Sequence, residues 1–281
     1  MDITKEYNDL KQVIEDAGKH ARAYFESDVN PATQKEDGSL VTEIDQRVER
    51  IIREHVEARF PDDTIVGEEE DTKEGTSGFV WYIDPIDGTD NFVRKIPFFS
   101  VTATRLGPTP EDSFSIIHNP VSRQTFASLM EDGTYENEHV CNLTADPIGS
   151  KYFITTASMK SEPWMNTARY KLLQGLVAEY GKSGHFSSGL LEHAYVAAGR
   201  LDGFLGTGYT AWDTAAGFYL VKAAGGAISL LEDGKWQRYE GAIRDIYGPT
   251  YDKRVSFFIS HPDIHEKVLE FVGNPKDWAE K

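Results

Sequence analysis

Residues 79–92 read FVWYIDPIDGTDNF, which is the most informative stretch of the chain. The apolar run from Phe79 to Ile83 has the length and continuity of a strand that is buried on both faces. It ends at once in Asp84, and we expect Pro85 to stop the hydrogen-bonded ladder because proline lacks a backbone N–H. The sequence therefore predicts a core strand with a carboxylate at its end.

A second carboxylate follows on the predicted turn. Asp84 and Asp87 are three residues apart, a spacing that can aim both side chains at one point. Gly88 and Thr89 come next, where a new helix could begin with free backbone N–H groups that bind phosphate oxygens. Ordinary turn chemistry is the alternative interpretation of an isolated Asp-Pro or Asp-Gly pair. Carboxylates beside a phosphate cradle instead predict a magnesium-phosphate site.

Two further acids lie at comparable places in the chain. Glu68 closes another short strand, although three consecutive acids over residues 68–70 usually form a solvated surface. Asp213 opens a helix of small residues, where a helix N-cap is the alternative interpretation. Together with the first two carboxylates, these acids form a set of hard oxygen donors of the kind that selects Mg²⁺. The four acids therefore predict metal-dependent phosphate chemistry.

The rest of the chain mixes helical and strand-like patterns. Apolar residues recur at three- and four-residue steps over 10–25 and 44–56, which indicates two amphipathic helices, and residues 30–39 between them are expected to form a polar loop. Further strands are expected at 65–66, 79–83, 98–104, 114–117, 125–130, 152–156, 201–205, 227–231 and 255–260, and helices at 164–180, 190–198, 213–224 and 264–272. We expect one α/β domain over residues 1–281, divided into two lobes near 145–150.

Composition limits the classes of function. The chain carries 46 acidic and 29 basic side chains, and its net charge of −17 argues against a nucleic-acid partner, because nucleic acids are bound through many Lys and Arg contacts. Cys141 is the only cysteine, which excludes an internal disulfide and fits a reducing compartment. The polar start and the lack of any long apolar stretch predict neither export nor a membrane span. A cytoplasmic protein is expected.

The acid-bearing stretches resemble the signature motifs of the inositol monophosphatase family, which are Mg²⁺-dependent, lithium-sensitive phosphatases. The matching stretches are Gly67-Glu68-Glu69, Trp81-x-Ile83-Asp84-Pro85-Ile86-Asp87-Gly88-Thr89-x-Asn91-Phe92 and Trp212-Asp213-x-Ala215-Ala216-Gly217. They occur in the family's order over nearly the whole chain. The resemblance implies a layered αβαβα sandwich of the sugar-phosphatase type, a homodimer, and hydrolysis of a small phosphate monoester.

The resemblance also implies that the four acids bind two to three Mg²⁺ ions. The first ion would be held by Glu68, Asp84 and the backbone carbonyl of Ile86. The second would be held by Asp84, Asp87 and Asp213, and Glu68 would also help to hold a looser third ion. Positioned metal charge is the main source of acceleration for phosphate-monoester hydrolysis, which is among the slowest uncatalysed reactions.

Other residues are implied to orient water, phosphate and substrate. Asp45 and Thr89 would orient the attacking water, although a capping role at the start of the second helix competes for Asp45. Gly88 and Thr89 would contact the phosphate. The substrate side would be formed by Asp87, Ser187, Ser188, Gly189 and Asp213. Lys35 would lie in a loop near the mouth of the site.

The substrate itself is the least determined feature. In the family, a glutamate before the Trp-Asp pair often hydrogen-bonds the hydroxyls of inositol, and Gly206 occupies that position here. We therefore expect a broad sugar or polyol monophosphatase for which inositol 1-phosphate is not the best substrate. Phosphatases of 3′-phosphoadenosine 5′-phosphate or of histidinol phosphate are the alternatives within the family.

Two other classes of protein are alternatives. Residues 206–211, GTGYTA, fit the Gly-x-Gly-x-x-Ala pattern of a dinucleotide-binding turn between a strand and a helix. Dinucleotide-binding folds carry this pattern at the start of their sheet. Too few residues follow it in this chain to complete such a sheet. A non-catalytic binding protein with a relict acid cluster is the second alternative, and it predicts no turnover of any phosphate ester with Mg²⁺.

Overall fold

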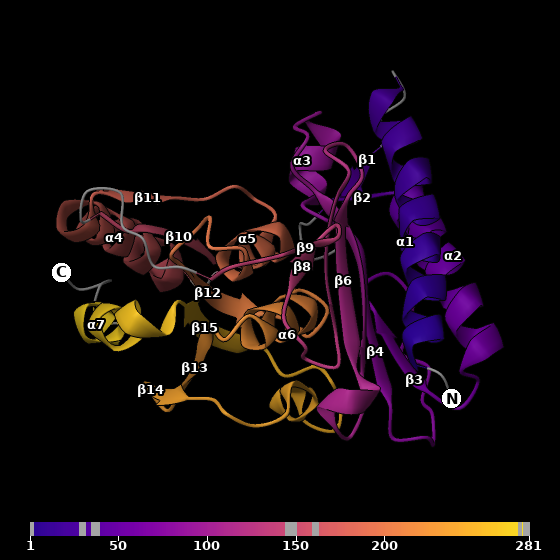
Figure 1. The fold of residues 1–281 in the computed structure, drawn as a ribbon. Helices are drawn as coiled ribbons and strands as arrows, with labels where there is room; N and C mark the ends of the chain where they lie inside the picture. The colour runs from indigo at the N-terminus through magenta and orange to yellow at the C-terminus, as the bar shows by residue number, and fades with distance from the viewer. Residues whose placement is uncertain are drawn as a thin grey trace.

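The structure is a computed structural model that describes residues 3–27, 32–34, 40–143, 151–158, 163–274 and 277. Two β-sheets and the helices that cover them are stacked as alternating layers (Figure 1). The predicted α/β fold and its αβαβα layering are confirmed. Lys35 and the predicted lobe division at 145–150 lie outside the described residues.

The first layer consists of α1 (Ile3–Glu26) and α2 (Glu43–Arg59), which pack against each other and against the larger sheet. The buried positions of α1 are Leu10, Ile14, Ala17, Gly18, Ala21 and Phe25, and all of them except Gly18 belong to the predicted apolar stripe. Before α2, β1 (Ala32–Gln34) pairs antiparallel with β2 (Leu40–Thr42). The expectation of a polar loop over residues 30–39 is therefore wrong in part, because its described portion is a hairpin strand.

The larger sheet has the strand order β3-β4-β5-β6-β7-β8-β9. Its first pair, β3 and β4, is parallel, and every later neighbour is antiparallel. The strands are β3 (Thr64–Gly67), β4 (Val80–Asp87), β5 (Ser100–Leu106), β6 (Phe114–Asn119), β7 (Gln124–Leu129), β8 (Tyr135–Glu136) and β9 (His139–Val140). Every residue of β4 is buried, as the continuous apolar run predicts.

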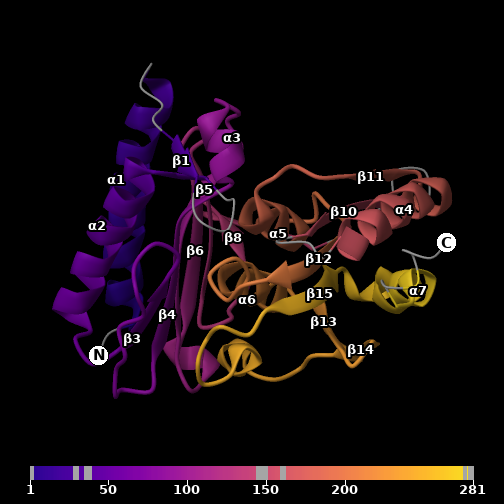
Figure 2. The same cartoon turned by 180° about the vertical axis from the view of Figure 1, so that it is seen from behind.

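The middle layer consists of α5 (Gly189–Ala197) and α6 (Ala215–Ala223), which contact both sheets (Figures 1 and 2). The smaller sheet has the order β11-β10-β12-β15-β13-β14. Its strands are β10 (Phe153–Ser158), β11 (Lys182–Gly184), β12 (Gly203–Tyr209), β13 (Ala227–Glu232), β14 (Lys235–Arg238) and β15 (Val255–Ser260). The outer layer is formed by α4 (Pro163–Tyr180) and α7 (Pro262–Val272).

The dinucleotide-binding alternative for residues 206–211 is wrong. Gly206 and Gly208 both lie inside β12, which pairs with β10 and β15, so they form no turn between a strand and a helix. A cofactor pyrophosphate needs such a turn with a helix N-terminus directly behind it.

No helix within the described part of the chain is long and apolar enough to span a bilayer.

Candidate active site

Pro85 does not end the strand as predicted, because a β-bulge accommodates it. Asp84 pairs with Thr102 of β5 and Asp87 pairs with Ser100. Three residue steps along β4 therefore lie opposite two residue steps along β5, which leaves one extra residue in β4. Proline occurs within sheets at bulges, where its missing N–H breaks no ladder bond. Asp84 and Asp87 therefore belong to the bulged end of β4, and not to a free turn.

Glu68 reaches the same edge of the sheet through the parallel pairing of β3 with β4. Gly67, the last residue of β3, lies opposite Ile83, which directly precedes Asp84. Because the carboxyl ends of neighbouring parallel strands emerge side by side, Glu68 follows β3 where Asp84 begins the bulge. The two predicted strand ends are thus adjacent, as the sequence pattern requires.

The predicted acids lie close enough to influence one another. The pKa of Asp84 is raised well above its ordinary value, first by burial and then by four neighbouring negative charges. Those charges belong to Glu68, Asp87, Asp213 and Asp45. The structure therefore brings together all five acids that the sequence singled out, from α2, from the ends of β3 and β4, and from the segment before α6.

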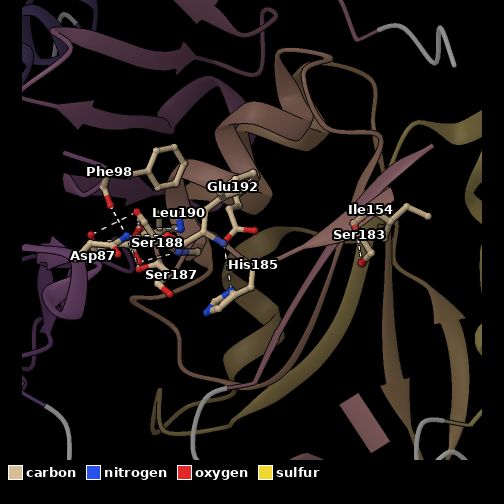
Figure 3. Close-up of polar contacts among 12 residues, drawn as sticks. Asp87, Phe98, Ile154, Ser183, His185, Ser187, Ser188, Leu190 and Glu192 are labelled. Carbon is tan, nitrogen blue, oxygen red and sulfur yellow. Dashed lines mark hydrogen bonds and ion pairs between the residues drawn. The ribbon is translucent and has the colours of Figure 1, made fainter. Parts of the chain in front are cut away.

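Asp87 is bound to the start of α5. Its Oδ1 accepts a hydrogen bond from Gly189 N at 3.1 Å, and its Oδ2 accepts bonds from Ser188 Oγ at 2.5 Å and Leu190 N at 2.9 Å (Figure 3). Burial raises the pKa of Asp87 to about 6, although the hydrogen bond from Ser188 works in the opposite direction. Ser188 and Gly189, which were expected on the substrate side, thus contact Asp87 in this structure.

Asp213 does not cap the helix that follows it. The N-cap position of α6 is Thr214, and Asp213 Oδ2 instead accepts hydrogen bonds from Thr210 N, at 3.2 Å, and from Thr210 Oγ1. The carboxylate is buried, with 6% of the residue exposed. These contacts tie the Asp213 carboxylate to Thr210, so the alternative interpretation of Asp213 as the N-cap is wrong.

The residues predicted to orient water and phosphate lie around the end of β4. Thr89 Oγ1 donates to the Ile86 carbonyl oxygen at 3.1 Å, and its single hydrogen cannot also be donated to Asp45. Asp45 is fully buried in the first turn of α2. Gly88 precedes the short helix α3 (Thr89–Val93) with φ +90°, and a Cβ there would lie 2.9 Å from Ser187 O. Only glycine fits this turn without strain.

Two polar residues with no assigned role connect the motif stretch to the loop before α5. Asn91 Nδ2 donates to the carbonyl oxygens of Phe98 and Phe186, both at 2.7 Å. Glu192 is fully buried, and its Oε1 accepts a bond from Phe186 N at 3.1 Å and lies 3.5 Å from His185 Nδ1 (Figure 3). A charged residue within an otherwise apolar helix is a sequence signal that could have identified Glu192.

The acids supply hard oxygen donors, which are the ligands that a cation such as Mg²⁺ prefers. No described residue donates a hydrogen bond to Asp84 Oδ1, although this oxygen is buried. A buried carboxylate oxygen without a donor is costly, and a bound cation removes that cost. Within the described residues, no three Asp, Glu, His or Cys side chains are arranged as a ready set of metal ligands, and Asp87 is turned toward α5. The acids thus share one region without converging on one point.

Comparison with known proteins identifies the family. The sequence profile of the inositol monophosphatase family matches residues 3–271. The chain belongs to the inositol monophosphatase family. The resemblance inferred from the motifs is thereby confirmed, and membership in this family makes the protein a phosphatase that acts on phosphate monoesters.

Two sequence relatives of this inositol monophosphatase family member have different names. Nus factor SuhB of Escherichia coli (strain K12) is 33% identical over 217 residues, which cover 76% of this chain and 80% of the relative. Inositol-1-monophosphatase of Rhizobium meliloti (strain 1021) is 32% identical over 242 residues, which cover 84% and 89%.

Solved structures agree on the fold of this inositol monophosphatase family member. An IMPase from Thermotoga maritima superimposes with a TM-score of 0.80 at 24% identity, covering 98% of this chain and 99% of that one. The extragenic suppressor protein suhB from Bartonella henselae gives a TM-score of 0.78 at 25% identity and covers 98% of both chains.

Proposed function

We propose that this protein hydrolyses a small sugar or polyol monophosphate at the acid cluster, with Mg²⁺ as its cofactor. The observation that carries the proposal is Asp84, a buried carboxylate among four other negative charges, with one oxygen to which no described residue donates a hydrogen bond. Such a group is stable as an anion only when a cation neutralises it. A phosphate ester supplies further oxygen ligands for that cation.

The proposed ligands are those expected from the sequence. Glu68, Asp84 and the Ile86 carbonyl would hold one Mg²⁺, Asp84, Asp87 and Asp213 would hold a second, and Glu68 would contribute to a third. When bound, the ions supply positive charge that neutralises phosphate oxygens and lowers the pKa of water. Ser188, Gly189 and Leu190 hold the Asp87 carboxylate in place through the hydrogen bonds described above.

Thr89 and Asp45 would orient the attacking water. Because Thr89 Oγ1 donates its only hydrogen to Ile86 O, the hydroxyl oxygen would act toward that water as a hydrogen-bond acceptor. Asp45, buried at the start of α2 and within electrostatic reach of Asp84, would accept the water's other proton. Gly88 and Thr89 would contact the phosphate, and Ser187 would face the substrate.

The substrate preference is proposed from the surroundings of Gly206. A Cβ at Gly206 would lie 2.5 Å from two ring atoms of Phe257, which is fully buried. The ring thus fills the space in which a longer side chain at this position would begin, so no carboxylate from here can bind a substrate hydroxyl. Loss of one such hydrogen-bonding group relaxes discrimination among polyols.

Phosphate release in the presence of Mg²⁺ tests the proposed activity. We expect chelation to abolish turnover of a sugar phosphate and Mg²⁺ to restore it. Asp87→Asn should lower kcat by about 10² or more, because the change removes a charge that acts on the reacting centre. Circular dichroism of the variant controls for folding. Turnover at the wild-type rate by folded Asp87→Asn would contradict the metal assignment.

A substrate screen tests the proposed preference. Inositol 1-phosphate, hexose phosphates, fructose 1,6-bisphosphate, histidinol phosphate and 3′-phosphoadenosine 5′-phosphate should be compared by kcat/KM. We expect several sugar or polyol phosphates to be hydrolysed, and inositol 1-phosphate not to be the best of them. An exclusive preference for inositol 1-phosphate would show that another residue replaces the missing carboxylate.

Four further expectations belong to the same proposal. The protein should form a homodimer, be inhibited by lithium, act in the cytoplasm and bind no nucleic acid. The last follows from the net charge of −17, which repels phosphate backbones wherever no metal ion intervenes.

A further inference from the structure

A buried ion pair lies behind the segment that carries Glu68. Glu49 and Arg53 are one turn apart on α2, and Arg53 Nε donates to Glu49 Oε1 at 2.7 Å. Their side chains are 0% and 5% exposed. Withdrawing two charges from water is costly unless both form further hydrogen bonds, so the other partners of this pair show which groups it holds in place.

Those partners are backbone groups directly after Glu68. Glu49 Oε2 accepts a hydrogen bond from Glu69 N at 2.8 Å, and Glu49 Oε1 accepts one from Glu70 N at 3.2 Å. Arg53 Nη2 donates to Glu70 O at 3.0 Å. The ion pair thus binds the backbone of two consecutive residues, Glu69 and Glu70, which follow the proposed metal ligand immediately.

The residue before Glu68 is held equally closely. A Cβ at Gly67 would lie 2.0 Å from Glu49 Oε1, so this approach of the carboxylate to the backbone requires glycine. Gly67 is in turn held in register with Ile83 by the pairing of β3 with β4. The backbone is therefore fixed on both sides of Glu68, whose charge acts on Asp84.

We infer that Glu49 and Arg53 are positioning residues that orient Glu68 for metal binding and so set the affinity of the site for Mg²⁺. The inference rests on the proposed function, because Glu68 is there a ligand of the first ion. Removal of groups that orient metal ligands typically weakens metal binding by about 10 to 100-fold. A pair that served stability alone would affect unfolding and leave metal affinity unchanged.

The chain offers a matched control in a second buried ion pair. Arg105 Nε donates to Asp63 Oδ2 at 2.9 Å, and these side chains are 4% and 5% exposed. Asp63 directly precedes β3, so it lies at the opposite end of that strand from Glu68. Asp63→Asn should therefore lower the melting temperature without changing Mg²⁺ affinity.

The test is Glu49→Gln, which keeps the shape of the side chain but loses its charge and one acceptor. Calorimetric titration of the full-length, metal-free protein with MgCl₂ measures binding independently of activity. We expect the dissociation constant for Mg²⁺ to rise at least tenfold in Glu49→Gln and to stay at the wild-type value in Asp63→Asn. If Glu49→Gln does not fold, Arg53→Lys replaces it, because an ammonium group cannot bind Glu49 and Glu70 O as the guanidinium does.

A double-mutant cycle with Glu68→Gln separates positioning from general damage. If the pair acts through Glu68, Glu49→Gln should weaken Mg²⁺ binding no further in the Glu68→Gln background. Unchanged Mg²⁺ affinity in Glu49→Gln, or a loss that persists in full without the Glu68 carboxylate, would overturn the inference. Failure of the wild-type protein to bind Mg²⁺ would instead contradict the proposed function.

Discussion

At the residue scale, the two carboxylates of the bulge have different surroundings. Asp87 has hydrogen bonds to both oxygens from the start of α5, whereas Asp84 Oδ1 receives none from the described residues. Burial raises the pKa of both side chains. Burial therefore disfavours the ionised form of both side chains in the metal-free protein, and hydrogen bonds from Ser188 and Leu190 counteract this effect only at Asp87.

The raised pKa of Asp87 predicts a pH dependence of stability. The pKa is about 6 in the folded protein and about 4 in the unfolded chain, so between these values the folded state holds a proton that the unfolded state has released. The contribution of Asp87 to the free energy of unfolding should therefore fall as pH rises from about 4 to about 6.

Urea unfolding in EDTA, compared between wild type and Asp87→Asn, isolates this contribution from other carboxyl groups. The free energy of unfolding of the wild type minus that of Asp87→Asn should decrease from about pH 4 to about pH 6. Added Mg²⁺ should reverse the trend for wild type if, as proposed, it binds the ionised carboxylates. A difference that is constant with pH would contradict the raised pKa.

At the element scale, the contact between α5 and α6 depends on small residues. His193 of α5 is fully buried and packs against the rings of Phe204, Phe218 and Phe257. Neither of its ring nitrogens has a hydrogen-bond partner among the described residues, and burial lowers its pKa to about 3. The ring is therefore neutral near pH 7, and α6 approaches it closely because residue 217 is glycine.

We expect Gly217→Ala to reduce the free energy of unfolding by about 1–3 kcal/mol, as overpacking of cores does. The added Cβ would lie 2.2 Å from His193 Nδ1, so a helix or the ring must shift. Chemical denaturation measures the loss. The double variant His193→Ala/Gly217→Ala should lose less than the sum of the single variants, because removal of the ring relieves the clash. Simple additivity would show that the two residues do not interact.

At the scale of the whole molecule, the site depends on both sheets. Glu68, Asp84 and Asp87 lie at the carboxyl ends of β3 and β4 in the larger sheet. Asp213 lies in the segment between β12 of the smaller sheet and α6. One continuous hydrophobic cluster contains residues of both sheets and of the helices between them, among them Tyr82 and Phe257. The relative position of Asp213 and the other acids is therefore maintained by the core that the two sheets share.

Local patterns in the chain suffice for much of this architecture. The apolar run at 79–83 predicts a buried strand, and the acids after it and after 65–66 are predicted at strand ends, because strand periodicity and burial depend on neighbouring residues. The spacing of apolar residues likewise predicts α1 and α2. The bulge at Pro85 escaped prediction, because it depends on pairing with β5.

The partners of each acid follow from contacts between distant segments. Ser188 and Leu190 bind Asp87 from about a hundred residues away, the ion pair of Glu49 binds the backbone after Glu68, and Phe257 fills the space beside Gly206. No local spacing encodes these contacts, since hydrogen bonds and packing act over a few ångströms in space regardless of separation along the chain. The sequence thus predicts which acids carry the chemistry, and the folded core decides which groups contact them.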